Sequence, residues 1–237
     1  MNNYRIYPLK DLLEDMYLSA ISSALDVNQE DVIYNDSEDI TVGGTKVETL
    51  LSAKGTSKKK VFKEAEGRVL EFLKSFKCER NPDVQDFLND SEKAIRMQKE
   101  SVSRTYLLIE PDKFEIAAYF SLALKPVSIN DNHKISKSKI KQSNLETLQD
   151  DLSVCSTYLI GQIGRDDRFK SSDINLNEIL EFVFAVINNV RRLIGGRVLL
   201  IEVNKEPKLI KKYESCGFQN IESDTELTQL MQWVKTY

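Results

Sequence analysis

The chain has 237 residues, of which 41% are hydrophobic and 30% are charged, and its formal net charge at pH 7 is −4. This length fits one large domain, or one domain with an extension. The acidic balance argues against a protein that binds nucleic acid over most of its surface, because such proteins are usually basic. No stretch approaches the roughly 20 apolar residues of a membrane-spanning helix, and the first residues lack the apolar core of a signal peptide. We therefore expect a cytoplasmic protein without a membrane partner.

The cysteines and the single histidine exclude several classes of active site. Cys78, Cys155 and Cys216 are odd in number and far apart, which indicates neither a disulfide framework nor a cysteine zinc site. His133 lies in a polar segment, whereas a Ser–His–Asp or Cys–His site needs an imidazole held by packing. The chain also lacks the GxxxxGK[ST] sequence of a P-loop nucleotidase. No metal site is expected.

The N-terminal part is predicted to be a helical extension, residues 1–70. Residues 9–25 place leucine, isoleucine, methionine and alanine at helical spacing, and we expect this apolar face to pack within the chain. Residues 26–44 are acidic and rich in turn formers, and a short helix is predicted at 45–53. The segment GTSKKK at 55–60 is interpreted as a polar linker, because such lysines are more often a solvated turn than a phosphate-binding patch.

The middle of the chain is predicted to alternate helices with a hairpin. Residues 61–73 fit a helix that runs into a strand near 74–79, and a further helix is expected at 83–101 after Asn81–Pro82. Two strands follow, at 103–110 and 113–124, joined by a turn at Pro111–Asp112. The polar residues 128–143 are either a lid or binding loop beside the sheet, or a solvated insertion.

The clearest pattern lies between residues 154 and 218. It predicts, in order, a buried strand, a polar turn, a long amphipathic helix stopped by two glycines, a second strand and a short helix; the ranges are 154–163, 164–173, 174–196, 197–204 and 207–215. A strand, helix and strand in succession usually form a crossover within one sheet. Since the first helix amides have no intrahelical partners, the turn at 164–177 is the first place to look for a bound phosphate, although most such turns are merely capped.

These residues resemble the GNAT superfamily of acyl-CoA-dependent N-acyltransferases over roughly residues 72–237. The most specific piece is LIKKYESCGF at 209–218, which is similar to that family's helix ending in Tyr-x-x-x-Gly-Phe, and TYLLIE with EIAAYFSL resembles its second and third strands. These residues resemble in particular the branch that includes toxins acetylating aminoacyl-tRNA and their prophage-type relatives. The resemblance implies an α+β (α/β) fold, with a mixed central sheet and flanking helices over residues 71–237, after the helical extension.

The resemblance also implies a cofactor, acetyl-CoA, and a set of site residues. In the family the pantetheine amides pair with a strand backbone, which here implies Ile163, Gly164 and Arg165. The pyrophosphate would lie over the start of the long helix, at Lys170, Ser171, Ser172, Asp173, Ile174 and Asn175. The acceptor amine would attack the thioester directly, and Tyr213 would protonate the departing thiolate as general acid.

Some residues depart from the family pattern and leave the activity open. The phosphate turn contains no glycine between Gly164 and Gly195, and Asp173 places a carboxylate where a dianionic group would bind. Asn175 and Glu178 form an N-x-x-E pattern that can cap the helix by itself. The basic residues Arg165, Arg168 and Lys170 supply compensating charge. Tyr213 also has a structural interpretation, because with Leu209, Ile210 and Phe218 it falls on an apolar helix face.

Two functions of different classes therefore remain. One is an active N-acetyltransferase whose acceptor is a small amine, a protein amine or an aminoacyl-tRNA. The other is a degenerate GNAT-fold module that binds or regulates without catalysis. Glu202 and Asp151 are candidate bases, and a tRNA acceptor predicts a basic stripe from the lysines at 134–141 with Lys208, Lys211 and Lys212. A homodimer is a possible assembly.

Overall fold

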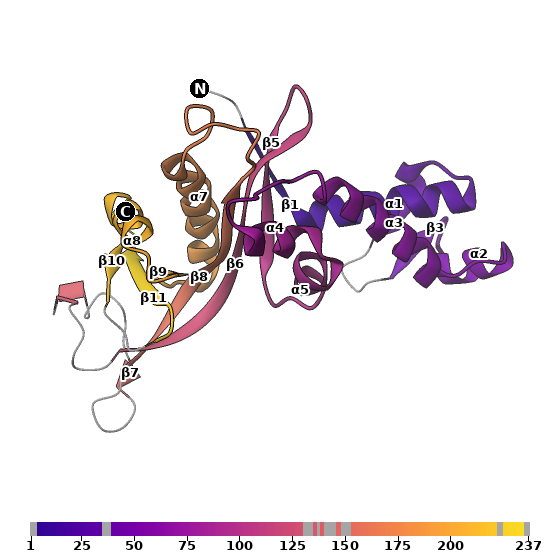
Figure 1. Ribbon diagram of the computed structural model, residues 1–237. Coiled ribbons are helices and arrows are strands. Elements are labelled where there is room, and N and C mark those ends of the chain that lie inside the picture. Colours follow the sequence, from indigo (N-terminus) through magenta and orange to yellow (C-terminus); the bar gives the residue numbers. More distant parts are fainter. Residues whose placement is uncertain are drawn as a thin grey trace.

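A computed structural model describes residues 4–34, 39–129, 135–136, 138–139, 146–147, 153–221 and 225–234. Strands and helices are interspersed along the chain, as expected of an α+β fold (Figure 1). Among the described residues, no helix combines the length and the apolar character needed to cross a membrane.

One mixed sheet dominates the fold, with the strand order β1-β5-β6-β8-β9-β11-β10. Its strands are β1 (Arg5–Pro8), β5 (Arg104–Glu110), β6 (Glu115–Ile129), β8 (Ser153–Arg165), β9 (Val198–Val203), β10 (Gln219–Asn220) and β11 (Thr228–Trp233), and β7 (Glu146–Thr147) pairs with the start of β8. β8 and β9 are parallel and are connected by α7 (Leu176–Ile194), which confirms the predicted crossover. The other neighbouring pairs are antiparallel.

Helices cover both faces of this sheet (Figure 1). On one face, residues of α7 and α8 (Pro207–Ser215), such as Val183 and Tyr213, pack against β6 residues such as Phe120. On the other face, α1 (Leu9–Leu25), α3 (Lys58–Leu73) and α4 (Pro82–Asn89) pack against Leu107 and Tyr119. The alternation of Tyr119 and Phe120 between the two faces is the period-two pattern of a strand buried on both sides.

The first 70 residues are joined to the sheet and also carry a hydrophobic cluster of their own. β1 pairs with β5, and the start of α1 packs against the sheet with α3, so this end of α1 is buried as expected. Farther out, α1, α2 (Val47–Ala53), α3 and the small sheet β2 (Val32–Tyr34), β3 (Ile40–Val42) and β4 (Thr45–Lys46) enclose a cluster that includes Ile21 and Leu51. α3 runs across residue 70, and the domain boundary there stays a prediction.

Three local predictions were wrong. Residues 74–79 form no strand: Phe76 and Cys78 are buried in alternation, but the amide of Lys77 donates to the Asp166 carboxylate at 2.9 Å instead of to a neighbouring strand. The segment at 55–60 is not all linker, because α3 begins at Lys58 with Ser57 as its N-cap.

The third error is the single helix predicted at 83–101. It is divided into α4, a π-helical turn (Ser91–Ile95) and α5 (Arg96–Lys99). The break falls at Asp90, whose backbone is extended and whose side chain accepts a hydrogen bond from the amide of Glu92. A carboxylate that caps a new turn competes with continuation of the preceding helix.

Candidate active site

The parallel strands β8 and β9 separate before either strand ends. Their pairing runs from Thr157 opposite Val198 to Ile160 opposite Ile201, whereas β8 continues to Arg165. On its other side β8 stays paired with β6 as far as Ala118 opposite Arg165. Within the described residues, the β9-facing edge of residues 161–165 therefore has no strand partner. Such an edge presents backbone N–H and C=O groups that can pair with an extended ligand.

A β-bulge at Gly161 coincides with this separation. Leu122 is opposite Ile160 and Ser121 is opposite Gln162, so Gly161 is the extra residue of β8. A β-carbon placed at Gly161 would lie 3.2 Å from the Ser121 hydroxyl oxygen, which favours glycine here. Bulges bend a strand and increase its twist, which explains why β8 turns away from β9 from this point on.

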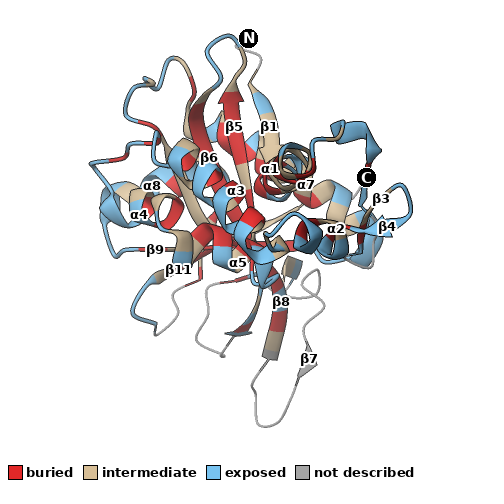
Figure 2. Cartoon of the chain, turned by 90° about the vertical axis from the view of Figure 1, so that its right-hand side faces the viewer, coloured by how far each residue is buried: buried red, intermediate tan, exposed pale blue. Residues whose placement is uncertain are grey.

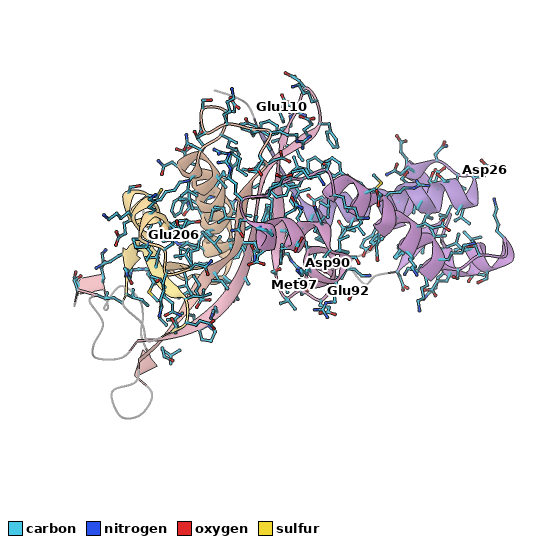
Figure 3. All side chains as sticks on the ribbon, in the orientation of Figure 1. Asp26, Asp90, Glu92, Met97, Glu110 and Glu206 are labelled. Carbon is cyan, nitrogen blue, oxygen red and sulfur yellow. The ribbon has the colours of Figure 1, made fainter. Side chains whose placement is uncertain are left out.

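A cleft of about 510 Å³ opens between the separated strands. It is lined from five directions, by the end of β8, the end of β9, the start of α7, α8 and the start of α4. Ile163, Gly164 and Arg165 lie along one wall and Tyr213 lies in another, so the structure brings together these four predicted site residues. In Figure 3, the labelled Glu206 marks the N-terminal end of α8, on the same side of the sheet as α7.

Tyr213 is held inward by the short helix α8. Pro207 occupies the first turn and Gly217, with φ of 94°, follows its last turn. The Tyr213 side chain is only 6% exposed, and its ring packs edge-to-face against Phe218 with centroids 5.7 Å apart. Burial raises the pKa of the Tyr213 phenol well above its usual value of 10. The group is therefore fully protonated at neutral pH.

Gly164 allows α4 to approach β8 at the cleft. A β-carbon at this position would overlap Cγ1 of Val84 and would lie 3.5 Å from the ring of Phe76. Val84 itself lines the cleft. Only the absence of a side chain at Gly164 therefore lets this wall of the cleft form as it does.

The predicted phosphate turn borders the cleft but does not line it, and several of its polar groups are bonded within the chain. None of Lys170 to Asn175 is among the cleft-lining residues. The Asp173 carboxylate accepts from the Lys170 amide at 2.7 Å, and Arg165 donates to the carbonyl of Ile174 at 3.0 Å. Ser171 and Ser172 are exposed. The turn at residues 170–175, called the phosphate corner below, is thus held by hydrogen bonds to groups of the protein itself.

The start of α7 is closed in the same way. The Asn175 side chain accepts from the amide of Glu178 at 3.2 Å, and the Glu178 carboxylate accepts from the amide of Asn175 at 2.7 Å. This is the capping box that the N-x-x-E pattern indicated. It satisfies two of the amides that would otherwise face an anion.

A charged network at the other end of the cleft includes Glu202. Its carboxylate accepts from Lys125 at 2.6 Å and from Gln229 at 2.8 Å. Burial raises the pKa of Glu202, but the hydrogen bonds from Gln229 and Lys125 outweigh this effect and leave the pKa below its usual value. Glu202 is thus a fixed negative charge at the cleft. Sequence analysis did not identify Lys125 and Gln229, which come from two other strands; Asp151 lies outside the described residues.

The remaining candidate groups near this site are already bonded or lie apart from one another in the described part of the chain. Among the described residues, no group of three or more histidine, cysteine, aspartate or glutamate side chains could hold a metal ion. Cys216, three residues after Tyr213, donates its thiol to the Lys212 carbonyl at 3.2 Å. The predicted basic stripe can be followed only in part: Lys208, Lys211 and Lys212 are exposed on α8, whereas the lysines at 134, 137 and 141 lie outside the described residues.

Solved structures share the overall fold of this chain. AtaT complexed with acetyl-methionyl-tRNAfMet is 18% identical, with a TM-score of 0.51 over 67% of this chain and 85% of that chain. A tyrosine-to-phenylalanine mutant of the AtaT toxin is 17% identical, with a TM-score of 0.52 over 68% and 82% of the two chains. The chain has the GNAT fold.

The sequence identity to these solved structures is low. A tyrosine-to-phenylalanine mutant of KacT is 16% identical, with a TM-score of 0.50 over 67% of this chain and 85% of that chain. No protein-family model matches the chain, and no curated protein matches it. At such low identity the likeness establishes the architecture, as the sequence resemblance predicted, and leaves the chemistry of the GNAT-fold cleft to its own residues.

Proposed function

We propose that the protein is an N-acetyltransferase that transfers an acetyl group from acetyl-CoA to an amine. One observation carries the proposal: the unpaired edge of β8 and the side chain of a buried tyrosine, Tyr213, belong to the lining of the same cleft. An extended pantetheine arm has two amides that can pair with an exposed strand edge in the manner of an added strand. Backbone groups of Ile163, Gly164 and Arg165 would hold it there.

The reaction needs no covalent enzyme intermediate. The neutral amine attacks the thioester carbonyl carbon, a tetrahedral oxyanion forms, and its collapse breaks the carbon–sulfur bond. The electron pair of that bond leaves with sulfur as a thiolate, while the nitrogen gives its proton to water and becomes the amide nitrogen. Tyr213 then gives its phenolic proton to the thiolate. Because burial raises its pKa, the phenol carries this proton over the whole neutral range.

Glu202 would serve the acceptor side of the same cleft. An amine arrives mostly as an ammonium ion, and an ionised carboxylate attracts it. With a lowered pKa, Glu202 is a better binder of this cation than an acceptor of its proton. Its hydrogen bonds to Lys125 and Gln229 hold the carboxylate in one orientation.

The similar structures suggest the order in which candidate acceptors should be assayed. One similar structure is AtaT with acetyl-methionyl-tRNAfMet, so an aminoacyl-tRNA is the first acceptor to assay. Small amines and protein amines come next. We propose acetyl-CoA as the cofactor of this chain, because the unpaired edge of β8 can pair with the amides of its pantetheine arm.

Tyr213→Phe tests the general acid. If Tyr213 donates the proton, kcat should fall by about 10²- to 10⁴-fold while the KM for acetyl-CoA stays within about twofold. Tyr106→Phe is the control, because Tyr106 is a partly buried tyrosine that packs on Phe120 and does not line the cleft. Thiol release followed at several pH values adds a second readout: deprotonation of Tyr213 should not limit the rate below about pH 10. Unchanged turnover in Tyr213→Phe would remove the phenol from the mechanism.

The closed phosphate corner favours a second candidate, a GNAT-fold module that binds a partner without catalysis. Its capping box and the Asp173 bond leave few free amides for a pyrophosphate. Titration calorimetry with acetyl-CoA separates the two functions. Binding heat together with a thermal shift supports the enzyme. The absence of both signals at millimolar acetyl-CoA supports the module.

A further inference from the structure

A second groove lies in the N-terminal part of the molecule. It opens between α1, α3 and the turn after α5, has a volume of about 690 Å³, and shares no lining residue with the cleft of Tyr213. Its walls are formed by Lys10, Leu13, Glu14, Tyr17, Tyr34, Ile40, Lys58, Lys59, Phe62, Lys63, Glu66, Gln98, Lys99, Ser101 and Arg104. In Figure 1 these helices lie on the opposite side of the sheet from α7.

The groove is strongly basic although the protein is acidic. Six cationic and two anionic side chains line it, a local net charge of +4 in a chain of net charge −4. Three of the lysines are paired: Lys10 with Glu14 at 3.3 Å, Lys99 with Glu66 at 2.6 Å, and Lys58 with Glu48, which is not a lining residue, at 3.7 Å. Lys59 and Lys63 are exposed on α3 and pair with no carboxylate in the described part of the chain. This charge distribution fits a polyanion.

Aromatic rings lie among these cations. Tyr17 and Phe62 are stacked, with centroids 4.2 Å apart and planes inclined by 14°. The ammonium group of Lys58 lies 5.4 Å from the centroid of Phe62, and Tyr34, at the edge of the groove, is 42% exposed. Tyr17 and Phe62 cover each other's faces, so the exposed ring of these three is that of Tyr34. Lysines for the backbone together with an exposed aromatic face for a base are the combination that binds single-stranded nucleic acid. An acidic peptide would use the lysines but not the rings.

We infer that this groove binds a single strand of RNA. Lys59, Lys63 and Arg104 would contact its phosphates, and the exposed ring of Tyr34 would stack on a base. The groove also contains acceptors that suit the ribose 2′-hydroxyl, which DNA lacks. They are the Glu14 carboxylate, which pairs with Lys10 through Oε1, and the Ser101 hydroxyl, whose oxygen also accepts from Arg104 at 3.1 Å. This function does not depend on the proposed acetyl transfer, since the groove and the cleft are separate.

The test uses the full chain without acetyl-CoA and a fluorescent oligouridine of about ten nucleotides, followed by anisotropy between about 0.05 and 0.3 M salt. Each phosphate contact with a single strand contributes roughly 0.7 to the slope of log affinity against log salt. Lys59→Gln/Lys63→Gln should therefore lower the slope by about 1.4 and weaken binding about 25-fold at 0.1 M salt.

The matched control is Lys60→Gln/Arg68→Gln. Both residues are exposed on the same helix, lie outside the groove, and carry the same charge to be removed. Binding by this variant should stay within about twofold of the parent. An equal loss of affinity in both variants would mean that binding depends only on the net charge of the protein. It would overturn the proposal that the groove is the binding site. Thermal unfolding of each variant shows that the fold is intact.

Three competitors distinguish the ligand class. An unlabelled oligouridine should displace the probe at lower concentration than a DNA strand of the same length, a duplex RNA or polyglutamate. Displacement by polyglutamate at an equal charge concentration would assign the groove to acidic proteins and overturn the proposal. Equal competition by the DNA strand would contradict the role given to Glu14 and Ser101. Absence of any binding at the lowest salt would also overturn it.

Discussion

The two halves of the proposed cofactor site differ in how many of their backbone groups already have hydrogen-bond partners within the protein. Along β8, residues 161–165 leave β9 and present an unpaired edge to a cleft. At the start of α7, residues 170–178 bond to one another through Asp173, Asn175 and Glu178. One half is open to a ligand, whereas the other is already occupied by protein groups.

This difference separates the two parts of coenzyme A. The pantetheine arm needs only strand-like hydrogen bonds, which the β8 edge can supply. The pyrophosphate needs free amides or cations, and here the amides of Lys170, Asn175 and Glu178 are already bonded, which gives more weight to side chains such as Lys170 and Arg168. Arg168 is itself engaged with Asp166 and Glu115, at 2.9 and 3.0 Å. We therefore expect cofactor affinity to depend more on β8 than on the α7 corner.

The largest effect is expected at the open half. Gly164→Ala should lower the free energy of unfolding by about 1–3 kcal/mol, because the new β-carbon overlaps Val84 and overpacking costs energy of this order. Denaturant titration measures it. Gly67→Ala is the matched control, since Gly67 has open space around it in α3 and should gain up to about 1 kcal/mol from helix propensity.

Adding Val84→Ala sharpens this prediction. Val84 contributes the atom that the new β-carbon would meet, so Gly164→Ala/Val84→Ala should cost less than the sum of the two single changes. Additive losses would show that the contact is not what restricts position 164. Acetyl-CoA binding by the same variants reports whether the wall made by α4 and β8 shapes the cleft.

A smaller effect is expected at the closed half. Asn175→Ala removes the N-cap of α7 and should cost about 1 kcal/mol of stability. The same change at Asn177, which is exposed two residues later in the helix, should cost nothing measurable. If the corner holds the pyrophosphate, freeing its amides by Asn175→Ala should not weaken acetyl-CoA binding; a large loss of affinity would mean that the Asn175 side chain itself contacts the cofactor.

Much of the region around the cleft could be predicted because its signals are local. The buried run of β8, the helical spacing of α7, the N-x-x-E cap and Gly195 are each visible within a few residues, and all four were confirmed. The confinement of Tyr213 to an apolar helix face was also visible, as was its place in the motif. These features depend on neighbours in sequence.

The cleft itself could not be predicted in the same way. It exists because pairing between β8 and β9 stops after four residue pairs, and only the glycine at 161 marks that point in the sequence. Lys125 and Gln229 meet Glu202 from strands far apart in the chain. β1 was missed because four residues carry too little periodicity, and its pairing with β5 is decided by the sheet.

The lysines at 58–60 show how one boundary changes a functional interpretation. As part of a linker, these lysines would form a solvated turn without a binding function. Once α3 begins at Lys58, helical spacing directs Lys59 and Lys63 to one face and Lys60 away from it. The basic groove follows from that starting residue, and Figure 2 shows how much of this part of the surface is exposed.

The smallest expected effect concerns Asp173. Its carboxylate adds a negative charge where a pyrophosphate would bind, so Asp173→Asn should strengthen acetyl-CoA binding by up to about fivefold at low salt. The amide oxygen of asparagine can still accept from Lys170, so the turn should keep its conformation. Asp31→Asn removes the same charge from an exposed position in the N-terminal part and should leave the affinity unchanged.

The salt dependence of this gain decides its meaning. An effect due to charge must shrink as salt screens it, and should be lost near 1 M, where the Debye length is about 3 Å. A gain that persists at high salt would come instead from a rearranged turn that frees the Lys170 amide. No gain at any salt would place the pyrophosphate away from residues 170–175, and the closed half of the site would then have no part in holding the cofactor.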